Sequence, residues 1–307
     1  MKGRVIKSTG SWYTVQVEGG LLQARLRGKF KQDELKLTNP IAVGDYVKMV
    51  KEQDLGTALI EEILPRKNYI IRKSTRKTGF SHILASNIDQ AFLIVTIRNP
   101  RTSLGFIDRF LVSTESFRIP ASLIINKTDL IKKEKDLEFL QDLEEIYAPL
   151  GYPVIKISAT EEENLDENLG ALLKGKTTLL SGHSGVGKST ILNKVVPDAN
   201  QVVREISSFT SKGTHTTTFA EMFEFGEDGY IIDTPGIKEF GILDIEDQEL
   251  SHYFVEMRAY LGKCKYNNCQ HLHEPECKVI QAVEEGYIHP YRYDSYVRIL
   301  HEEETHR

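Results

Sequence analysis

The chain has 307 residues, a mass of 34.9 kDa and a formal charge of −5. That length predicts two or three domains, each able to bury a core. The acidic balance, with a pI near 6.0, argues against a protein coated throughout in positive charge for nucleic acid. The N-terminus lacks the apolar core of a signal peptide, and no run reaches the ~18 apolar residues of a membrane span. We therefore expect a cytoplasmic protein without a membrane partner.

The first 65 residues alternate polar and apolar in short runs broken by glycines, which predicts a small β-barrel. These runs are RVIKS, YTVQVEG, LLQARLRG and DYVKMV. From about residue 89, longer apolar runs alternate with helical stretches, which indicates an α/β domain with buried parallel strands. Those runs are AFLIVTI, SLIIN, PVIKIS, TTLLS, FAEMFEF and YIID. After about residue 245 the strands stop, and helix-like segments surround three cysteines. We expect three domains, over residues 1–68, 69–244 and 245–307.

The stretch GHSGVGKS at 182–189 fits the phosphate-binding pattern GxxxxGKS and lies between a predicted strand and a predicted helix. In such a loop backbone N–H groups turn inward around the phosphates. Lys188 reaches the β and γ oxygens, which also makes it a candidate catalytic residue, and the Ser189 hydroxyl can ligate Mg²⁺. A glycine turn that only caps a helix is the alternative. The candidate phosphate-binding residues are Gly182, His183, Ser184, Gly185, Val186, Gly187, Lys188, Ser189 and Thr190.

The tetrapeptide DTPG at 233–236 follows another predicted strand. Asp233 could hold the magnesium shell there, and the Gly236 N–H could meet the γ-phosphate. By itself this tetrapeptide is a common turn.

The tetrapeptide NKTD at 126–129 predicts guanine as the base. Asp129 can accept hydrogen bonds from the guanine N1–H and the exocyclic amine. Adenine offers neither donor and would leave the carboxylate unpaired, at a cost of ~1–3 kcal/mol or more. SAT at 158–160 ends the next strand and matches a second guanine-contacting loop. NKTD alone could be a polar turn, and the three residues of SAT carry little weight by themselves, but the motifs follow successive strands of one domain. The candidate guanine-binding residues are Asn126, Lys127, Thr128, Asp129, Ser158 and Ala159.

The motifs occur in a cyclically permuted order, with both base loops before the phosphate loop and DTPG last. A permuted GTPase with an N-terminal barrel, GHSGVGKST, GTHTTT, DTPGIKEFG and a trailing cysteine cluster resembles the RsgA family over essentially the whole chain. The resemblance implies a bacterial GTPase that acts in maturation of the small ribosomal subunit. It also implies an OB-fold, a circularly permuted P-loop GTPase domain and a mainly helical zinc-binding domain. Residues 234–244 would then join the switch to the cysteine-bearing domain, so GTP hydrolysis could reorient that domain.

Ile237 stands where many GTPases carry a glutamine that orients the attacking water. Another group must act, and His215 in the segment GTHTTT is the candidate catalytic residue, with a polar surface histidine as the alternative. We expect a threonine of the same segment, Thr217, to complete the Mg²⁺ shell with Ser189 and Asp233.

All three cysteines fall within the segment CKYNNCQHLHEPEC, an odd number that suits a metal site better than disulfides. Three thiolates and one imidazole suit a closed, structural, tetrahedral Zn²⁺ site. Two histidines, His271 and His273, compete for the fourth position. The family pattern CxxxxCxHxxxxxC implies the ligands Cys264, Cys269, His271 and Cys277.

Basic residues in the N-terminal third could bind ribosomal RNA, as the resemblance implies, although ordinary barrel surface is the alternative. One candidate face comprises Lys2, Arg4, Lys7, Arg25, Arg27, Lys29 and Lys31 with Trp12 and Tyr13. A run without acids adds Arg66, Lys67, Arg72, Lys73, Arg76 and Lys77.

The leading hypothesis is a monomeric, ribosome-stimulated GTPase that binds the small ribosomal subunit, assists its late maturation and hydrolyses GTP to GDP and phosphate. One rival is a GTP-dependent regulator of a protein complex that never meets RNA. Another is a zinc-stabilised RNA-binding protein whose nucleotide site only senses its ligand.

Overall fold

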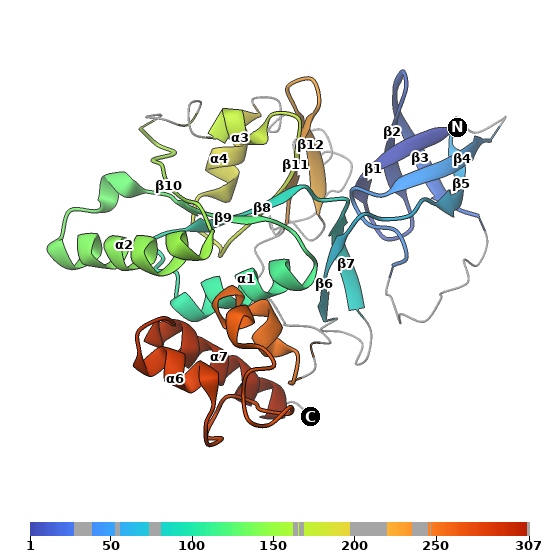
Figure 1. Cartoon of the computed structure of the whole chain (residues 1–307). Coiled ribbons are helices and arrows are strands. Elements are labelled where there is room, and N and C mark those ends of the chain that lie inside the picture. Colours follow the sequence, from blue (N-terminus) through green and yellow to red (C-terminus); the bar gives the residue numbers. More distant parts are fainter. Residues whose placement is uncertain are drawn as a thin grey trace.

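The computed structural model describes residues 1–27, 39–52, 56–73, 81–161, 165, 169–196, 220–234, 245 and 247–305. Within these ranges a barrel, an α/β part and a C-terminal helical part follow one another along the chain (Figure 1). The strands are β1 Lys2–Ser8, β2 Tyr13–Val17, β3 Gly20–Leu26, β4 Tyr46–Lys51, β5 Ala58–Ile63, β6 Tyr69–Lys73, β7 Ser81–Ser86, β8 Gln90–Val95, β9 Ala121–Ile125, β10 Val154–Lys156, β11 Thr177–Ser181, β12 Glu221–Phe225 and β13 Gly229–Asp233. The α-helices are α1 Leu104–Ser116, α2 Glu134–Tyr147, α3 Ala171–Leu173, α4 Lys188–Val195, α6 Lys278–Glu284 and α7 Pro290–Thr305. The 3-10 helices are η1 Thr128–Leu130, η2 Ala148–Leu150, η4 Leu250–Tyr253 and η5 Val255–Tyr260.

Strands β1 to β5 form a closed barrel, as the short alternating runs predicted. Its antiparallel pairs are β1–β2, β2–β3, β4–β5 and β1–β4, and the parallel pair β3–β5 completes the ring. The interior is filled by apolar side chains such as Val5, Val15, Val47 and Ile60, each 0% exposed. This OB-like barrel confirms the predicted architecture of the N-terminal part.

The central sheet has the strand order β10-β9-β8-β11-β13-β12. All neighbours are parallel except the pair β12–β13. The strands read as continuous apolar runs because both faces are covered. Ala91, Leu93 and Val95 of β8 pack in the core under α1 and α2, whereas Phe92 and Ile94 pack on the opposite side with α4. The predicted α/β class is therefore confirmed.

The barrel continues the central sheet, because Lys7 of β1 pairs with Glu221 of β12. A hairpin, β6–β7, connects the two parts and did not emerge from the sequence patterns. Buried Asp45, in the barrel loop before β4, holds this junction by bonding Arg66 before the hairpin and the Ser86 hydroxyl at its end.

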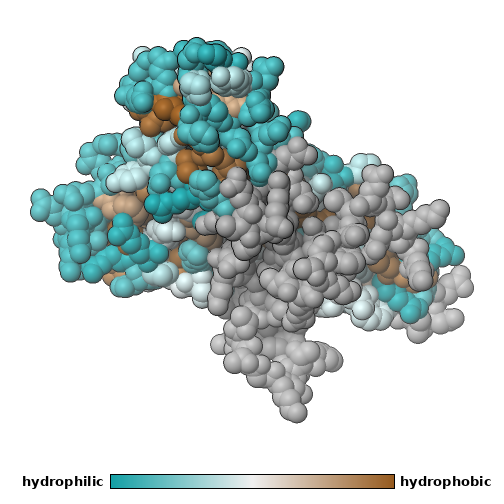
Figure 2. All heavy atoms as spheres, turned by 90° about the horizontal axis from the view of Figure 1, so that it is seen from below, coloured by the Kyte–Doolittle hydropathy of each residue, from teal (hydrophilic) through white to brown (hydrophobic). Residues whose placement is uncertain are grey.

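The C-terminal part is built from η4, η5, α6 and α7, which confirms the mainly helical prediction. Its core includes Phe254, Met257, Tyr296 and Leu300, and Val112 of α1 belongs to the same cluster. In Figure 1 this part lies against α1, on the face of the sheet opposite α3 and α4. None of the described helices is long and apolar enough to cross a membrane. In Figure 2, the coloured part of the surface is mainly hydrophilic, with small hydrophobic patches between the hydrophilic residues.

Candidate functional site

The predicted nucleotide motifs meet at one edge of the central sheet. NKTD follows β9, SAT follows β10, the phosphate loop follows β11 and Asp233 ends β13. These strands are parallel, so their carboxyl ends point the same way and bring the loops together. Motifs separated by more than a hundred residues in sequence thus form one site.

Asn126 is the side chain that joins three of these motifs. Its Nδ2 donates to the Val186 carbonyl of the phosphate loop at 2.8 Å, and its Oδ1 accepts from the Ala159 N–H of the SAT loop at 3.0 Å. The residue is 1% exposed, so both bonds are shielded from water. Gly187 makes the contact possible, because a Cβ at that position, with φ of +98°, would lie 2.3 Å from Asn126 Nδ2.

Lys127 lies along the same site in a left-handed conformation, with φ of +62°. Its Nζ donates to the Gly185 carbonyl at 2.7 Å and to the Asn99 carbonyl. Asn99 belongs to the loop between β8 and α1, which the sequence reasoning missed. The available signal was its place directly after a parallel strand, where loops at the carboxyl edge contribute to sites.

Asp129, the predicted guanine reader, is half-buried and oriented by its neighbour. Its Oδ1 accepts a 2.7 Å hydrogen bond from the Ser158 hydroxyl. Thr128 anchors the motif by donating from its hydroxyl to the Ile157 carbonyl at 3.0 Å. The base loops therefore support each other, which fixes the direction of the carboxylate before any base arrives.

Lys188 and Asp233 form the charged centre of the phosphate site. Lys188 is 9% exposed and donates to the Gly182 carbonyl at 2.6 Å and to the His183 carbonyl at 3.0 Å. Burial lowers the Lys188 pKa, and Asp233 opposes that shift. Burial raises the Asp233 pKa to about 6, which the positive charge of Lys188 partly offsets.

The donor set near Asp233 fits a hard cation. Asp233 Oδ1 is buried and has no hydrogen-bond partner among the described residues. Ser189 lies in the first turn of α4 with an exposed side chain. A carboxylate and a hydroxyl are ligands that Mg²⁺ accepts. The remaining predicted groups, Thr217, Gly236 and His215, lie outside the described residues, as does Ile237.

The phosphate loop is also supported from α1. The His183 ring stacks on Phe106, with centroids 3.6 Å apart and an interplanar angle of 28°. Burial and the charge of Lys188 lower the pKa of His183. His183 therefore faces an aromatic side chain, an arrangement that the loop pattern alone did not indicate.

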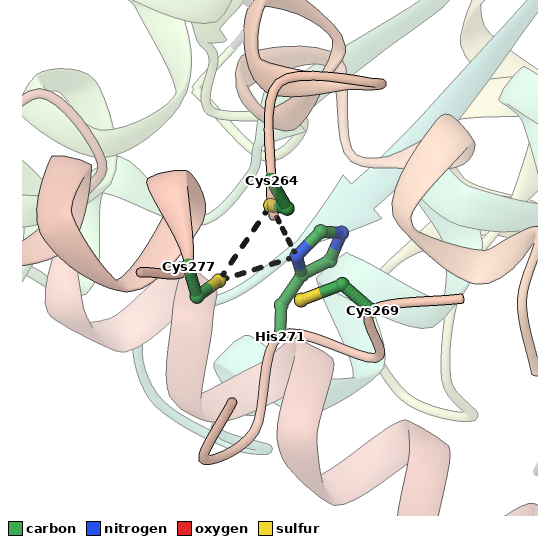
Figure 3. A group of neighbouring side chains, drawn as sticks. All are labelled: Cys264, Cys269, His271 and Cys277. Atoms are coloured by element: carbon green, nitrogen blue, oxygen red, sulfur yellow. Dashed lines mark hydrogen bonds between the residues drawn. The ribbon is translucent and has the colours of Figure 1, made fainter. Parts of the chain in front are cut away.

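The cysteine segment forms a compact cluster, shown in Figure 3. His271 Nδ1 lies 3.6 Å from Cys264 Sγ and 3.4 Å from Cys277 Sγ, and the two sulfurs are 3.9 Å apart. With Cys269, all four ligand atoms lie within 4.8 Å of one another. Tetrahedral ligands ~2.3 Å from zinc would be separated by about 3.5–4 Å, so the residues fit this metal. His273 is exposed and outside the cluster, so the geometry favours His271.

Two residues of the predicted RNA-binding face are buried and contact other parts of the protein. Tyr13 is 1% exposed inside the barrel and Arg4 is 8% exposed, so placing these two on the surface was wrong. Arg4 is buried because its guanidinium donates to Thr177 Oγ1 at 2.8 Å and lies over the Tyr230 ring, where it fills the junction of barrel and sheet. Trp12 is 43% exposed, so its side chain remains accessible to a binding partner.

Other basic residues of the two candidate groups are ion-paired in the structure. The pairs are Lys7–Glu221, Arg25–Glu52, Arg27–Glu61, Arg66–Asp45 and Lys67–Asp89. Lys29, Lys31, Arg76 and Lys77 lie outside the described residues, and the side chains of Arg72 and Lys73 are not described.

Comparison with known proteins gives full-length matches. A family model described as RsgA GTPase matches residues 63–243, and one described as RsgA N-terminal domain matches residues 2–60. The small ribosomal subunit biogenesis GTPase RsgA of Cytophaga hutchinsonii is 52% identical over 309 residues, with all of both chains covered. The protein of the same name from Bacteroides fragilis is 50% identical over 305 residues, covering 99% of this chain and 97% of that one.

Two solved structures are similar in fold and sequence. YjeQ from Thermotoga maritima has a TM-score of 0.74 at 38% identity, with 98% of this chain and 97% of that chain covered. YloQ, described as a circularly permuted GTPase, has a TM-score of 0.74 at 32% identity, with 100% and 96% covered. These matches confirm the permuted fold that the motif order predicted.

Proposed function

The chain belongs to the RsgA family of GTPases, and we propose that it hydrolyses GTP to GDP and phosphate while it assists late maturation of the small ribosomal subunit. The observation that carries the proposal is the pair of hydrogen bonds made by the Asn126 side chain. They connect its own base loop to the phosphate loop and to the second base loop. A nucleotide bound there would have its base and its phosphates held by one connected framework. Asp129, oriented by Ser158, selects guanine.

We assign the phosphates of GTP to the phosphate loop, with Lys188 beside the β- and γ-phosphate oxygens. Lys188 now bonds two loop carbonyls, and it would exchange them for phosphate oxygens. Ser189 and Asp233 would hold Mg²⁺, with Thr217 as the third protein ligand. The bound ion would neutralise negative charge that develops on the phosphate oxygens. Gly236 would contribute its N–H to the γ-phosphate.

Water activation is assigned to His215, because Ile237 cannot orient water. We propose that this histidine acts only after docking to the ribosomal subunit has brought it toward the γ-phosphate. The isolated protein should therefore turn over GTP slowly. Catalytic groups supplied by a partner are worth ~10³–10⁵ in other GTPases, so the stimulation should be large.

The cluster of Cys264, Cys269, His271 and Cys277 is proposed to hold one structural zinc ion. The four ligand atoms leave no open position for substrate, since a closed set of four is typical of structural sites. Metal binding would then be coupled to folding of the C-terminal part.

We further propose a cytoplasmic monomer with domains at residues 1–68, 69–244 and 245–307. Contact with ribosomal RNA is assigned to the barrel and the C-terminal part. Trp12 is the exposed aromatic residue of the predicted face and could stack on a base.

The decisive experiment measures GTP turnover with and without purified small ribosomal subunits. Strong stimulation supports the proposal. Stimulation by a protein complex but not by subunits would favour a regulator that never meets RNA. Binding of subunits without any turnover would favour the RNA-binding protein with a sensory site.

Two variants separate binding from catalysis in the same assay. Lys188→Ala should lose nucleotide binding itself. His215→Ala should keep GTP and subunit binding but lose most of the stimulated rate. Full stimulated turnover in His215→Ala would remove the histidine from the mechanism.

A further inference from the structure

Helix α1 lies between the phosphate loop and the C-terminal part. Near its N-terminus Phe106, 5% exposed, stacks on the His183 ring. The backbone carbonyl of His183 accepts a hydrogen bond from Lys188 Nζ at 3.0 Å. The Phe106 ring therefore supports the residue whose main chain positions the phosphate-binding lysine.

Two residues further along α1, Asp108 is bonded to the C-terminal part. Arg292 of α7 donates to Asp108 through one nitrogen and to Glu256 through two others, at 2.6 and 3.1 Å. The Arg292 and Asp108 side chains are each 1% exposed. Tyr147 of α2 also donates to Asp108, at 2.7 Å. This buried group connects α1, α2 and the C-terminal part.

The contact between α1 and the C-terminal part extends along the helix. Val112 is 0% exposed and packs in the C-terminal core with Phe254 and Tyr296. At the end of α1, Glu115 forms an ion pair with Arg258 at 2.6 Å, and the Arg258 side chain is 45% exposed. A displacement of the C-terminal part would therefore break packing at several points of one helix.

Buried charges make this docking selective for one geometry. A buried ion loses its hydration, so it is tolerated only where partners replace the lost hydrogen bonds. A single arrangement satisfies Arg292 with both carboxylates. Because a short stretch of helix is stiff, the arrangement at Asp108 also sets where Phe106 lies against His183.

We propose that Phe106 is a positioning residue for the phosphate-binding loop, and that the Arg292–Asp108 ion pair makes this positioning depend on docking of the C-terminal part. The inference rests on the proposed function in that this loop binds the phosphates of GTP. Linkage makes the effect reciprocal, so nucleotide binding strengthens the docking by the same factor. This route is separate from the covalent connection through residues 235–244.

The test is a double-mutant cycle on GDP affinity in the full-length protein. Phe106→Leu and Arg292→Met should each weaken GDP binding about five-fold or more. The double variant should bind GDP no more weakly than the more affected single variant, because both substitutions remove the same support of the phosphate-binding loop. If the two losses multiply, or if Arg292→Met leaves GDP affinity unchanged, the inference is overturned.

Control variants separate this role from general loosening of the fold. Arg298→Met on the same helix removes an exposed arginine paired with Asp294 and should leave GDP affinity unchanged. Arg292→Lys retains a cation and should recover part of the lost affinity. Amide exchange at 182–187 should rise in Arg292→Met while exchange in β9 stays constant. Equal increases in both segments would instead indicate general destabilisation and refute the inference.

A second link keeps the test informative if Arg292→Met does not fold. Arg258→Gln removes the half-exposed ion pair with Glu115 and a hydrogen bond to the His252 carbonyl within the C-terminal part, but it leaves the buried group of Arg292 and Asp108 intact. Its loss of GDP affinity should be smaller than that of Arg292→Met and should not multiply with that of Phe106→Leu. Multiplying losses would again overturn the inference. Failure of the unaltered protein to bind GDP would overturn the proposed function as well. If the unaltered protein binds GDP but the losses of affinity in the single variants multiply in the double variant, only this inference is overturned.

Discussion

Replacing Asn126 by alanine should disconnect the phosphate loop from both base loops. The substitution removes two hydrogen bonds at a site that is 1% exposed, and it leaves the Val186 carbonyl and the Ala159 N–H without their partner. Each buried polar group left unsatisfied costs about 1–3 kcal/mol, so the two together cost about 2–6 kcal/mol. That loss is a large part of the roughly 5–15 kcal/mol that stabilises a typical domain.

A matched control lies in the same chain. Asn68 makes the same pair of bonds to the main chain of Ile88, both at 2.8 Å, away from the nucleotide site. Asn68→Ala should therefore lower the free energy of unfolding without lowering GDP affinity, whereas Asn126→Ala should lower both. Urea unfolding of the nucleotide-free protein and GDP titration measure the two quantities. A change below about 0.5 kcal/mol for Asn126→Ala would refute the reasoning, because ordinary surface substitutions reach that size.

Three further predictions concern single positions. Asp129→Asn should weaken GTP binding and tolerate xanthine nucleotide, which carries a carbonyl at position 2; unchanged GTP affinity in a competition assay would contradict the base assignment. His271→Ala should lower the zinc content found by native mass spectrometry while His273→Ala should not, since only His271 faces the sulfurs; the reverse result would move the ligand. Gly187→Ala should weaken GDP binding as much as Asn126→Ala, because its Cβ would displace that side chain; GDP affinity equal to that of the unaltered protein would show that the loop can adapt.

The predicted RNA-binding face illustrates why residue types alone mislead. Arg4 and Tyr13 fit an RNA-binding surface by composition, yet both are buried. Arg4 fills the junction between barrel and sheet, and Tyr13 donates its hydroxyl to Asn39 inside the barrel. An amphipathic side chain can either face solvent or bury its polar end against a partner, and the partner is distant in sequence.

Short motifs were readable because their chemistry needs neighbouring residues. A phosphate loop requires consecutive backbone N–H groups, so GHSGVGKS carries its own signature. The four residues of the candidate metal site likewise lie within one short segment, and their spacing predicts a zinc site. The exact histidine was less certain from residues alone, and the positive φ of His271, +58°, is part of the local turn that brings its ring to the sulfurs.

The sequence by itself determined the three-part architecture and the permuted order of the motifs, and it predicts the chemistry of both candidate sites, since each depends on local pattern. Only the tertiary structure decided which side chains connect those parts. Asp108 and Arg292 are 184 positions apart, and Asn126 and Val186 are 60 apart. Such pairs form because sheet order and helix packing bring distant segments together, and a buried charge or amide then accepts only a partner with the right geometry. No periodicity along the chain encodes that choice.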